Sequence, residues 1–172
     1  MLLSTILVGL WLAGTAFAES AVLECTADTW IASYSRKTTS SNGSARTLRL
    51  KGSEAVLLLS FRVAVIEGWK IHRATLLIHR ASGGTPKGVG LSAVSIPWSE
   101  ASPGAARPNS RYAFVPVTEA GEGWLRVEVP PALIEQLRYG LAMIAGQNKA
   151  YEFHSRETVQ YSPYLLVEGS RR

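Results

Sequence analysis

The clearest pattern in the chain is a strict alternation of apolar and polar residues over short runs. In residues 124–129, Leu125 and Val127 fall on one side of the run and charged residues fall on the other. This period of two predicts a strand with one buried face. Residues 47–51 and 151–156 alternate in the same way. Helical spacing of apolar residues is not seen in any of these runs, so the pattern favours sheet.

Other runs are almost wholly apolar over strand length. Residues 55–63, 141–145 and 164–167 are of this kind, which predicts strands that are covered on both faces. A short leading strand is expected at Val22 and Leu23, ahead of a strand over 29–34. The predicted strands lie near Thr29, Leu48, Leu57, Leu76, Leu91, Phe114, Val127, Met143, Phe153 and Leu165.

Turn and breaker residues separate these runs. Pro116 lacks the N–H that a sheet needs, so residues 112–118 are expected to form an edge strand. A proline pair precedes residues 132–137, which predicts one short helix that ends at Gly140. About ten short strands with a turn roughly every 8–12 residues predict an all-β sandwich. No internal repeat or second domain is visible in the sequence.

The N-terminus has the features of a targeting segment. Residues 2–13 are mostly apolar, and Ala16-Phe17-Ala18 has the form of a cleavage site, so residues 1–18 are predicted to be a signal peptide. The apolar run is shorter than the ~20 residues of a membrane-spanning helix. We therefore expect a mature chain of residues 19–172, folded as one β-sandwich domain, secreted or periplasmic, with no membrane span.

The net charge and the number of cysteines limit the partners, disulfides and metal sites that the protein can have. Eighteen Lys and Arg against thirteen Asp and Glu give a net charge of +5, which could favour an anionic partner. The charges are scattered along the chain, as on an ordinary soluble surface, and we expect no nucleic-acid partner. Cys25 is the only cysteine, so neither an intrachain disulfide nor a thiolate metal cluster can form.

The sequence contains no motif of a known catalytic site. Patterns of the Gly-x-Ser-x-Gly, His-Glu-x-x-His and P-loop kinds are absent, and the three histidines do not have the spacing of a metal pair. We therefore predict that the protein is not an enzyme. A hydrolase or lyase that uses Glu100 or Glu157 stays open as an alternative. No cofactor is expected, although a calcium ion held by backbone carbonyls with Asp28 or Glu157 also stays open.

Sugar binding would need aromatic faces for C–H groups, polar side chains for hydroxyls and, for acidic sugars, Arg or Lys. Trp30, Trp124 and Phe61 lie inside apolar runs and are expected to be core residues. The loops and strand ends supply the exposed candidates for ligand binding, which are Tyr34, Arg36, Lys37, Trp98, Arg111 and Tyr112.

An ordered set of short motifs also points to a family. Ser155-Arg156-Glu157 follows an aromatic strand, and Pro163-Tyr164-Leu165 opens the last one. Further pieces precede them in order, namely Ala27-Asp28-Thr29-Trp30, Asn42-Gly43-Ser44, Ala74-Thr75-Leu76-Leu77 and Trp98-Ser99-Glu100. Together they resemble the DNRLRE-type domains, which overlap with carbohydrate-binding module family 96.

The resemblance implies a single jelly-roll-like antiparallel β-sandwich that binds carbohydrate without catalysis. Characterised members of the family are associated with alginate, so an acidic polysaccharide is the implied ligand. Ser155, Arg156 and Glu157 are expected to form a structural polar cluster, with a role in ligand binding left open. A structural envelope or adhesion domain without glycan binding is the alternative. Departures from the family's pattern, such as Ser60 where Arg is common, bear on the ligand more than on the fold.

Overall fold

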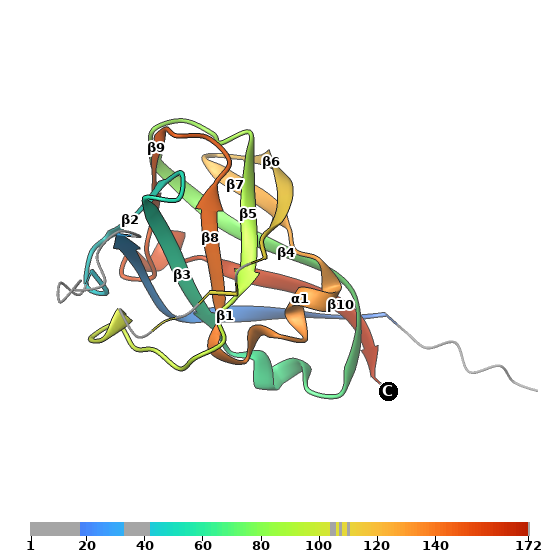
Figure 1. Cartoon of the computed structure of the whole chain (residues 1–172). Coiled ribbons are helices and arrows are strands. Elements are labelled where there is room, and N and C mark those ends of the chain that lie inside the picture. The colour runs from blue at the N-terminus through green and yellow to red at the C-terminus, as the bar shows by residue number, and fades with distance from the viewer. Residues whose placement is uncertain (1–17, 33–41, 104–105, 107, 110, 172) are drawn as a thin grey trace, which may run out of the picture.

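The computed structural model describes residues 18–32, 42–103, 106, 108–109 and 111–171 of the chain. Within these residues ten strands, one short α-helix and several 3₁₀ turns follow one another (Figure 1). The strands are β1 (Glu19–Ala32), β2 (Thr47–Lys51), β3 (Ala55–Phe61), β4 (Trp69–Ser82), β5 (Gly88–Ala93), β6 (Ala113–Gly121), β7 (Trp124–Glu128), β8 (Leu141–Ala145), β9 (Ala150–His154) and β10 (Tyr164–Arg171). The helical segments are η1 (Val63–Ile66), α1 (Pro131–Ile134), η3 (Leu137–Tyr139) and η4 (Val159–Tyr161).

The all-β class and the single short helix are confirmed, but the predicted jelly-roll-like sandwich is not. The strands pair in the order β1-β10-β4-β7-β6-β5-β8-β3, and β3 pairs back with β1. This closes eight antiparallel strands into a barrel instead of leaving two separate sheets. The β2–β9 pair bridges β3 and β4 at one end. In Figure 1, β3, β8 and β5 stand side by side while β1, β10 and β4 run across them.

Closure depends on three strands that each change partners along their length. The first half of β1 pairs with β10 and its second half with β3, with a register shift between Cys25 and Ala27. Such a bulge bends a strand and increases its twist. β4 passes from β10 and β7 to β9 in the same manner, with a shift between Arg80 and Ser82. The two predicted strands near Val22 and Thr29 are therefore one strand, β1.

β6 is the third of these strands, and it explains the position of Pro116. Ala113 to Pro116 pair with β5, whereas Val117 to Gly121 pair with β7. The predicted edge strand is therefore an interior member of the barrel. Pro116 is the last residue of β6 that pairs with β5, and Val117 is the first that pairs with β7. At this change of partner the strand can accommodate a residue without an N–H.

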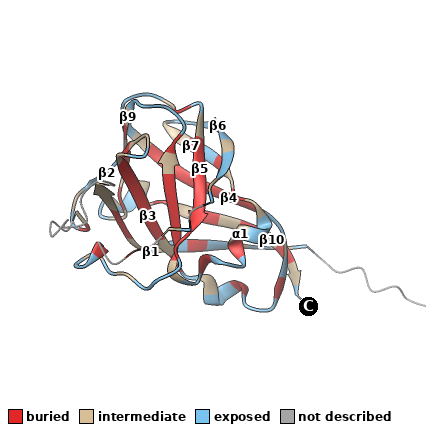
Figure 2. Cartoon of the chain, in the orientation of Figure 1, coloured by how far each residue is buried: buried red, intermediate tan, exposed pale blue. Residues whose placement is uncertain are grey.

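The core fills the barrel with the inward residues of the alternating runs. Each contributing strand supplies pairs that are at most 1% exposed, namely Leu48 and Leu50, Leu57 and Leu59, Leu76 and Ile78, Leu125 and Val127, Tyr151 and Phe153, and Leu165 and Val167. Figure 2 shows buried residues along β3, β8 and β5 and exposed ones in the connecting loops. Full burial of such side chains stabilises the fold by roughly 1.5–3 kcal/mol each.

A second, smaller core lies outside the barrel. Val56, Leu58 and Ala142 face away from the main core, yet they are buried against Val94 and Ala106. The long connection between β5 and β6 covers them, and Trp98 packs on this cluster. The prediction that the run from Ala55 is buried on both faces is confirmed for β3.

The helical segments differ in detail from the prediction. β3 ends at Phe61, and Val63, expected to continue the strand, begins η1. The predicted helix over 132–137 is split into α1 and η3, and Gly140 ends η3 with φ of 108°. A Cβ at this position would lie 2.5 Å from the Leu59 carbonyl oxygen, so the site needs glycine for space as well as for conformation. In the part of the chain that the structure describes, no helix has the length and apolarity needed to cross a membrane.

Candidate functional site

One aromatic ring stands out on the surface of the barrel. Phe114 in β6 is 65% exposed, more than any other phenylalanine or tryptophan side chain that the structure describes. It lies opposite Gly90 in β5. A Cβ on Gly90 would come within 3.1 Å of the ring atoms Cε1 and Cζ. The glycine therefore lets the ring lie close against the sheet while the rest of the ring contacts solvent.

A hollow of about 650 Å³ adjoins this strand, and we name it the β6 hollow. Arg111 and Tyr112, two of the predicted ligand-binding residues, line it together with Asn109 and Gln136. Burial raises the pKa of the half-buried Tyr112, so its hydroxyl stays protonated and can donate a hydrogen bond. A volume of this size falls within the roughly 300–1,000 Å³ of small-ligand sites. The β6 hollow thus combines a cation, a phenol and two amides.

The remaining predicted binding residues are placed differently. Trp98 is half-buried, and its indole Nε1–H donates a 2.7 Å hydrogen bond to the Tyr139 carbonyl oxygen. This contact and its packing on the second core make Trp98 a cover for β3 and β8, so it is not grouped with Arg111 and Tyr112. Tyr34, Arg36 and Lys37 lie outside the described residues.

The Ser155-Arg156-Glu157 element lies in a dense polar cluster. The Arg156 backbone N–H donates to Asp28 Oδ2 at 2.6 Å, and its guanidinium makes two hydrogen bonds to Glu100, at 2.8 and 2.9 Å. Glu157 approaches the same guanidinium at 3.2 Å. Ser155 is fully buried, and its hydroxyl accepts a hydrogen bond from the Glu157 N–H. The cluster joins β1, the β5–β6 connection and the β9–β10 connection.

Two carboxyl groups of this cluster, Asp28 and Glu100, have pKa values shifted in opposite directions. Burial is the main reason that the pKa of Asp28 rises from 3.8 to about 6, and its Oδ1 has no hydrogen-bond partner among the described residues. Burial would also raise the pKa of Glu100, but hydrogen bonds from Arg156 and from the Asp28 N–H lower it. Burial therefore disfavours the charged form of Asp28, whereas hydrogen bonds from Arg156 stabilise the charged form of Glu100.

A second hollow, of about 400 Å³, borders this cluster at Arg156. Arg156, Cys25 and Tyr164 are among the residues that line it. Burial strongly raises the pKa of the Cys25 thiol, and the thiol donates to the Ala27 carbonyl oxygen. A protonated thiol is a poor nucleophile and a poor metal ligand.

Aromatic and imidazole rings gather on the outer face of β4 and β7. His79 stacks on Tyr161 with ring centroids 3.8 Å apart, and Trp124, Tyr164 and His154 surround them. Trp124 is predicted to be a core residue, but it is half-buried on this outer face. These rings pack mainly against one another. The Nδ1 atoms of His79 and His154 are buried without a partner among the described residues.

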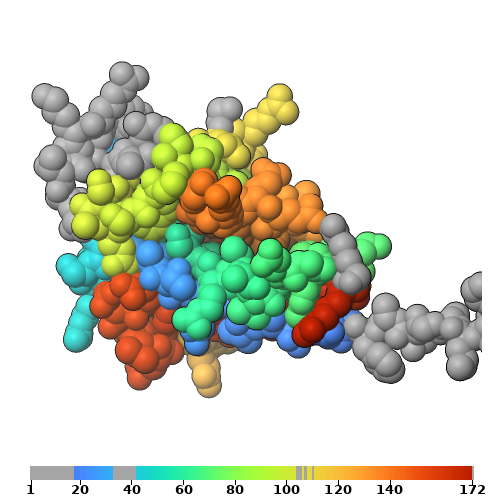
Figure 3. Space-filling model, turned by 90° about the horizontal axis from the view of Figure 1, so that it is seen from below, coloured from blue at the N-terminus to red at the C-terminus, as the bar shows by residue number. Residues whose placement is uncertain are grey.

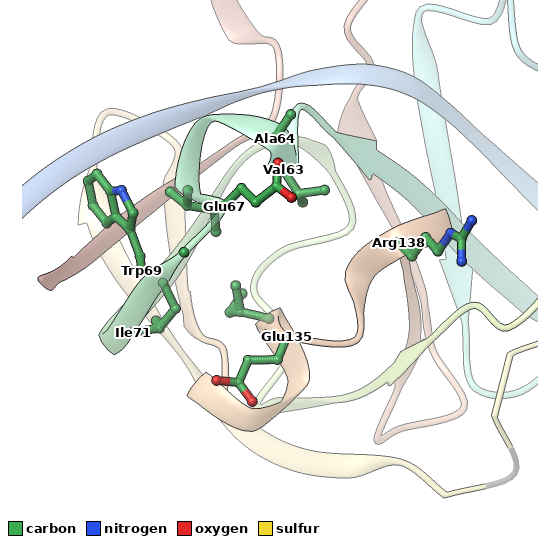
Figure 4. Close-up of a pocket in the computed structure, with 10 residues that line it drawn as sticks. Val63, Ala64, Glu67, Trp69, Ile71, Glu135 and Arg138 are labelled. Atoms are coloured by element: carbon green, nitrogen blue, oxygen red, sulfur yellow. The ribbon is translucent and has the colours of Figure 1, made fainter. Parts of the chain in front are cut away.

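A further hollow, of about 480 Å³, lies between η1 and α1, and we name it the η1–α1 hollow. Figure 3 shows the η1 segment in green and the α1–η3 segment in orange side by side on this face. The hollow has an apolar wall and a few charged residues at its margin, among them Glu67, Glu135 and Arg138 (Figure 4).

Potential metal ligands are not clustered in the part of the chain that the structure describes. Within residues 18–32, 42–103 and the other described positions, no three His, Cys, Asp or Glu side chains are grouped so that they could hold an ion. Asp28 and Glu157, the residues considered for calcium, both contact Arg156.

The closed eight-stranded fold with its surface hollows defines a small all-β domain. The family model of carbohydrate-binding module family 96 matches residues 19–169, so the chain belongs to this family. The resemblance found in the sequence is thereby confirmed. No curated protein matches the chain.

Proposed function

We propose that this protein is a non-catalytic module that binds a polysaccharide along β6, with Phe114, Tyr112 and Arg111 as its main contacts. The observation that carries the proposal is the 65% exposed Phe114 ring, which directly follows in sequence the residues Arg111, Tyr112 and Ala113 that line the β6 hollow, in a chain of a carbohydrate-binding family. We call these three residues with the β6 hollow the β6 surface.

The β6 surface has the parts that sugar recognition requires. The open side of the Phe114 ring can pack on the C–H groups of a pyranose, while Asn109 and Gln136 can exchange hydrogen bonds with hydroxyls. Tyr112 lies two residues before Phe114, and positions two apart on a strand are roughly 6.6 Å apart. The two rings can therefore contact successive positions of a polymer better than a single free sugar.

We propose an acidic polysaccharide, such as a uronate polymer of the alginate type, as the ligand. Arg111 is exposed at the β6 hollow, and the net charge of +5 favours an anionic chain. Arg36 and Lys37 stay part of this proposal as further cations, although they lie outside the described residues. Exposed ion pairs are worth only ~0–1 kcal/mol each, so the affinity would have to come from several contacts along the polymer.

We also propose that the protein works outside the cytoplasm. The apolar segment over residues 2–13 and the Ala16-Phe17-Ala18 sequence support export. The test is the N-terminal residue of protein recovered from the periplasm or medium of an expressing bacterium. Glu19 is expected, and a retained Met1 in the cytoplasmic fraction would contradict export.

Ligand charge is tested by affinity gel electrophoresis with alginate in the gel. Retardation is expected at low salt and should weaken as salt rises, because the Debye length falls from ~10 Å at 0.1 M to ~3 Å at 1 M. Arg111→Ala should reduce the retardation, while Arg126→Ala is a matched control, since Arg126 is exposed on β7 away from the β6 hollow. Equal retardation at both salt concentrations, or stronger binding to a neutral glucan, would refute the proposed ligand charge.

A further inference from the structure

Gly90 in β5 lies at a point of the sheet where side chains from both neighbouring strands meet. It pairs with Phe114 of β6 on one side and with Ile144 of β8 on the other. A Cβ at Gly90 would come within 2.9 Å of Ile144 Cγ1 and within 3.1 Å of the Phe114 ring atoms Cε1 and Cζ. Both side chains therefore lean over the space that a side chain at Gly90 would fill.

This glycine is needed for space and not for backbone conformation. Gly90 does not have a positive φ, so the backbone at this position would accept an alanine. Glycine inside a strand weakens the strand, because it has no side chain to pack and loses much conformational freedom on folding. The three atoms nearest to the added Cβ all belong to side chains. An alanine would therefore displace the Phe114 ring or Ile144 and leave the sheet in place.

We propose that Gly90 is a positioning residue of the glycan site, and that Phe114 and Ile144 form one apolar subsite across it for the C–H groups of a sugar ring. This inference deepens the function proposed above and rests on it. Because no side chain rises from Gly90, the far end of the Phe114 ring lies over β5, toward the half-buried Ile144. The ring thereby extends the binding surface from β6 toward β8.

The apolar subsite complements the charged part of the β6 surface. Arg111 supplies a cation for a carboxylate, whereas the side chains of Phe114 and Ile144 offer only apolar atoms. A uronate unit carries both kinds of group, namely apolar C–H groups on its ring and one carboxylate. Salt screens the ionic contact, but it leaves the apolar contact in place. The two parts of the surface can therefore bind one polymer through contacts that respond differently to salt.

A purely structural role for the contact between Phe114 and Gly90 leads to a different expectation. An aromatic ring that covers a strand glycine can serve only to stabilise the sheet. In that case Gly90→Ala changes the free energy of unfolding and leaves the affinity for polysaccharide unchanged. If Gly90 positions the ring for a ligand, the affinity itself falls, because the ring is displaced from the place where the sugar meets it.

The experiment is calorimetric titration of alginate into wild type and variants at low and at high sodium chloride. Gly90→Ala should weaken binding about fivefold at both salt concentrations, while the loss caused by Arg111→Ala should shrink at high salt. Gly146→Ala is the matched control and should leave the affinity unchanged. A Cβ on Gly146 would lie 3.2 Å from the Gly88 carbonyl oxygen, but no side chain that the structure describes lies within 4 Å of it.

Two further variants separate the parts of the proposal. Gly90→Ala combined with Phe114→Ala should bind as weakly as Phe114→Ala alone, because the ring that Gly90 positions is gone. Additive losses would overturn the positioning role. Ile144→Ala should weaken binding about threefold at both salt concentrations, and an unchanged affinity would remove Ile144 from the subsite.

The place of the ring is measured without ligand from the Ile144 Cδ1 methyl signal in ¹³C NMR spectra, which the Phe114 ring current shifts. Gly90→Ala should move this signal toward its position in Phe114→Ala, and Gly146→Ala should not. An unmoved signal, or a moved signal with wild-type affinity, would overturn the proposal. If wild type binds no polysaccharide, the proposed function fails and the subsite has no ligand, whereas the methyl signal still decides whether Gly90 sets the place of the ring.

Discussion

Asp28→Asn should make the protein more stable at neutral pH. Asp28 is fully buried in β1, and its Oδ1 has no hydrogen-bond partner among the described residues. Its Oδ2 accepts the Arg156 N–H at 2.6 Å, a bond that the carbonyl oxygen of the substituted amide side chain would retain. The substitution keeps the shape of the side chain and removes a buried negative charge, whose burial is costly.

The magnitude follows from the pKa of Asp28, which burial raises from 3.8 to about 6 in the folded protein. The folded state thus binds the proton more tightly than the unfolded state does. The stability from this group is fully present below pH 3.8 and is lost as the pH rises through about 6. A rise of this size in the pKa corresponds to about 3 kcal/mol, and we expect the mutant to gain up to that amount relative to wild type between about pH 4 and pH 7.5.

Urea unfolding of both proteins at several pH values measures this difference. The free energy of unfolding of Asp28→Asn minus that of wild type should rise with pH and level off above about pH 7. Using the difference cancels the titration of all other groups, provided that the two proteins unfold in a two-state manner with equal m-values. A difference that stays constant from about pH 4 to 7.5, or that falls with pH, would refute the assigned pKa and its cause.

Three further predictions test the polar cluster, the Trp98 cover and the imidazole pair. Arg156→Ala should lower the free energy of unfolding by about 1–3 kcal/mol in urea titrations, because Glu100 loses the two hydrogen bonds from the Arg156 guanidinium; equal stability would show that the pair is dispensable. Trp98→Phe should cost about 1 kcal/mol in thermal unfolding through loss of the 2.7 Å bond to Tyr139, and an unchanged midpoint would argue against that bond. Burial and the nearby His79 lower the pKa of His154, so the stability that neutral His154 contributes should be lost as the pH falls below 6.5. His154→Asn should therefore make the free energy of unfolding depend less on pH in this range than it does in wild type. An unaltered dependence on pH would contradict the lowered pKa.

The strands themselves could be predicted because each is encoded locally. Alternation places Leu125 and Val127 on one side of β7, and the structure buries both. Prolines and glycines mark the ends of the strands, and Gly140 ends η3 as expected. These signals depend on neighbouring residues in the chain and need no knowledge of the tertiary structure.

Closure of the barrel could not be predicted in the same way. It depends on the β1–β3 pairing and on the change of partner at Pro116, and both are set by residues far apart in sequence. A strand pattern states which face is buried, but not which neighbours cover it. From the sequence, Pro116 therefore predicts an edge strand. In the structure it lies where β6 changes its partner from β5 to β7.

The surface residues show the same limit. Trp124 and Trp98 are both half-buried, although the sequence predicts one in the core and the other in an exposed loop. The sequence assigns Phe114 to a strand but not to a site, and the missed signal is Gly90, which lies opposite it in β5. A glycine in a predicted strand indicates close approach by another group. Only the strand pairing identifies that group as the Phe114 ring.

The most direct test of the account is calorimetric titration of an acidic polysaccharide into Phe114→Ala, compared with wild type and with Val22→Ala. Val22 is 57% exposed on β1 and does not line the β6 hollow, so it controls for loss of an exposed apolar side chain. Phe114→Ala is expected to weaken binding at least about tenfold, or about 1.4 kcal/mol, and Val22→Ala is expected to leave the affinity unchanged. Equal affinity of all three proteins would contradict a glycan site on β6.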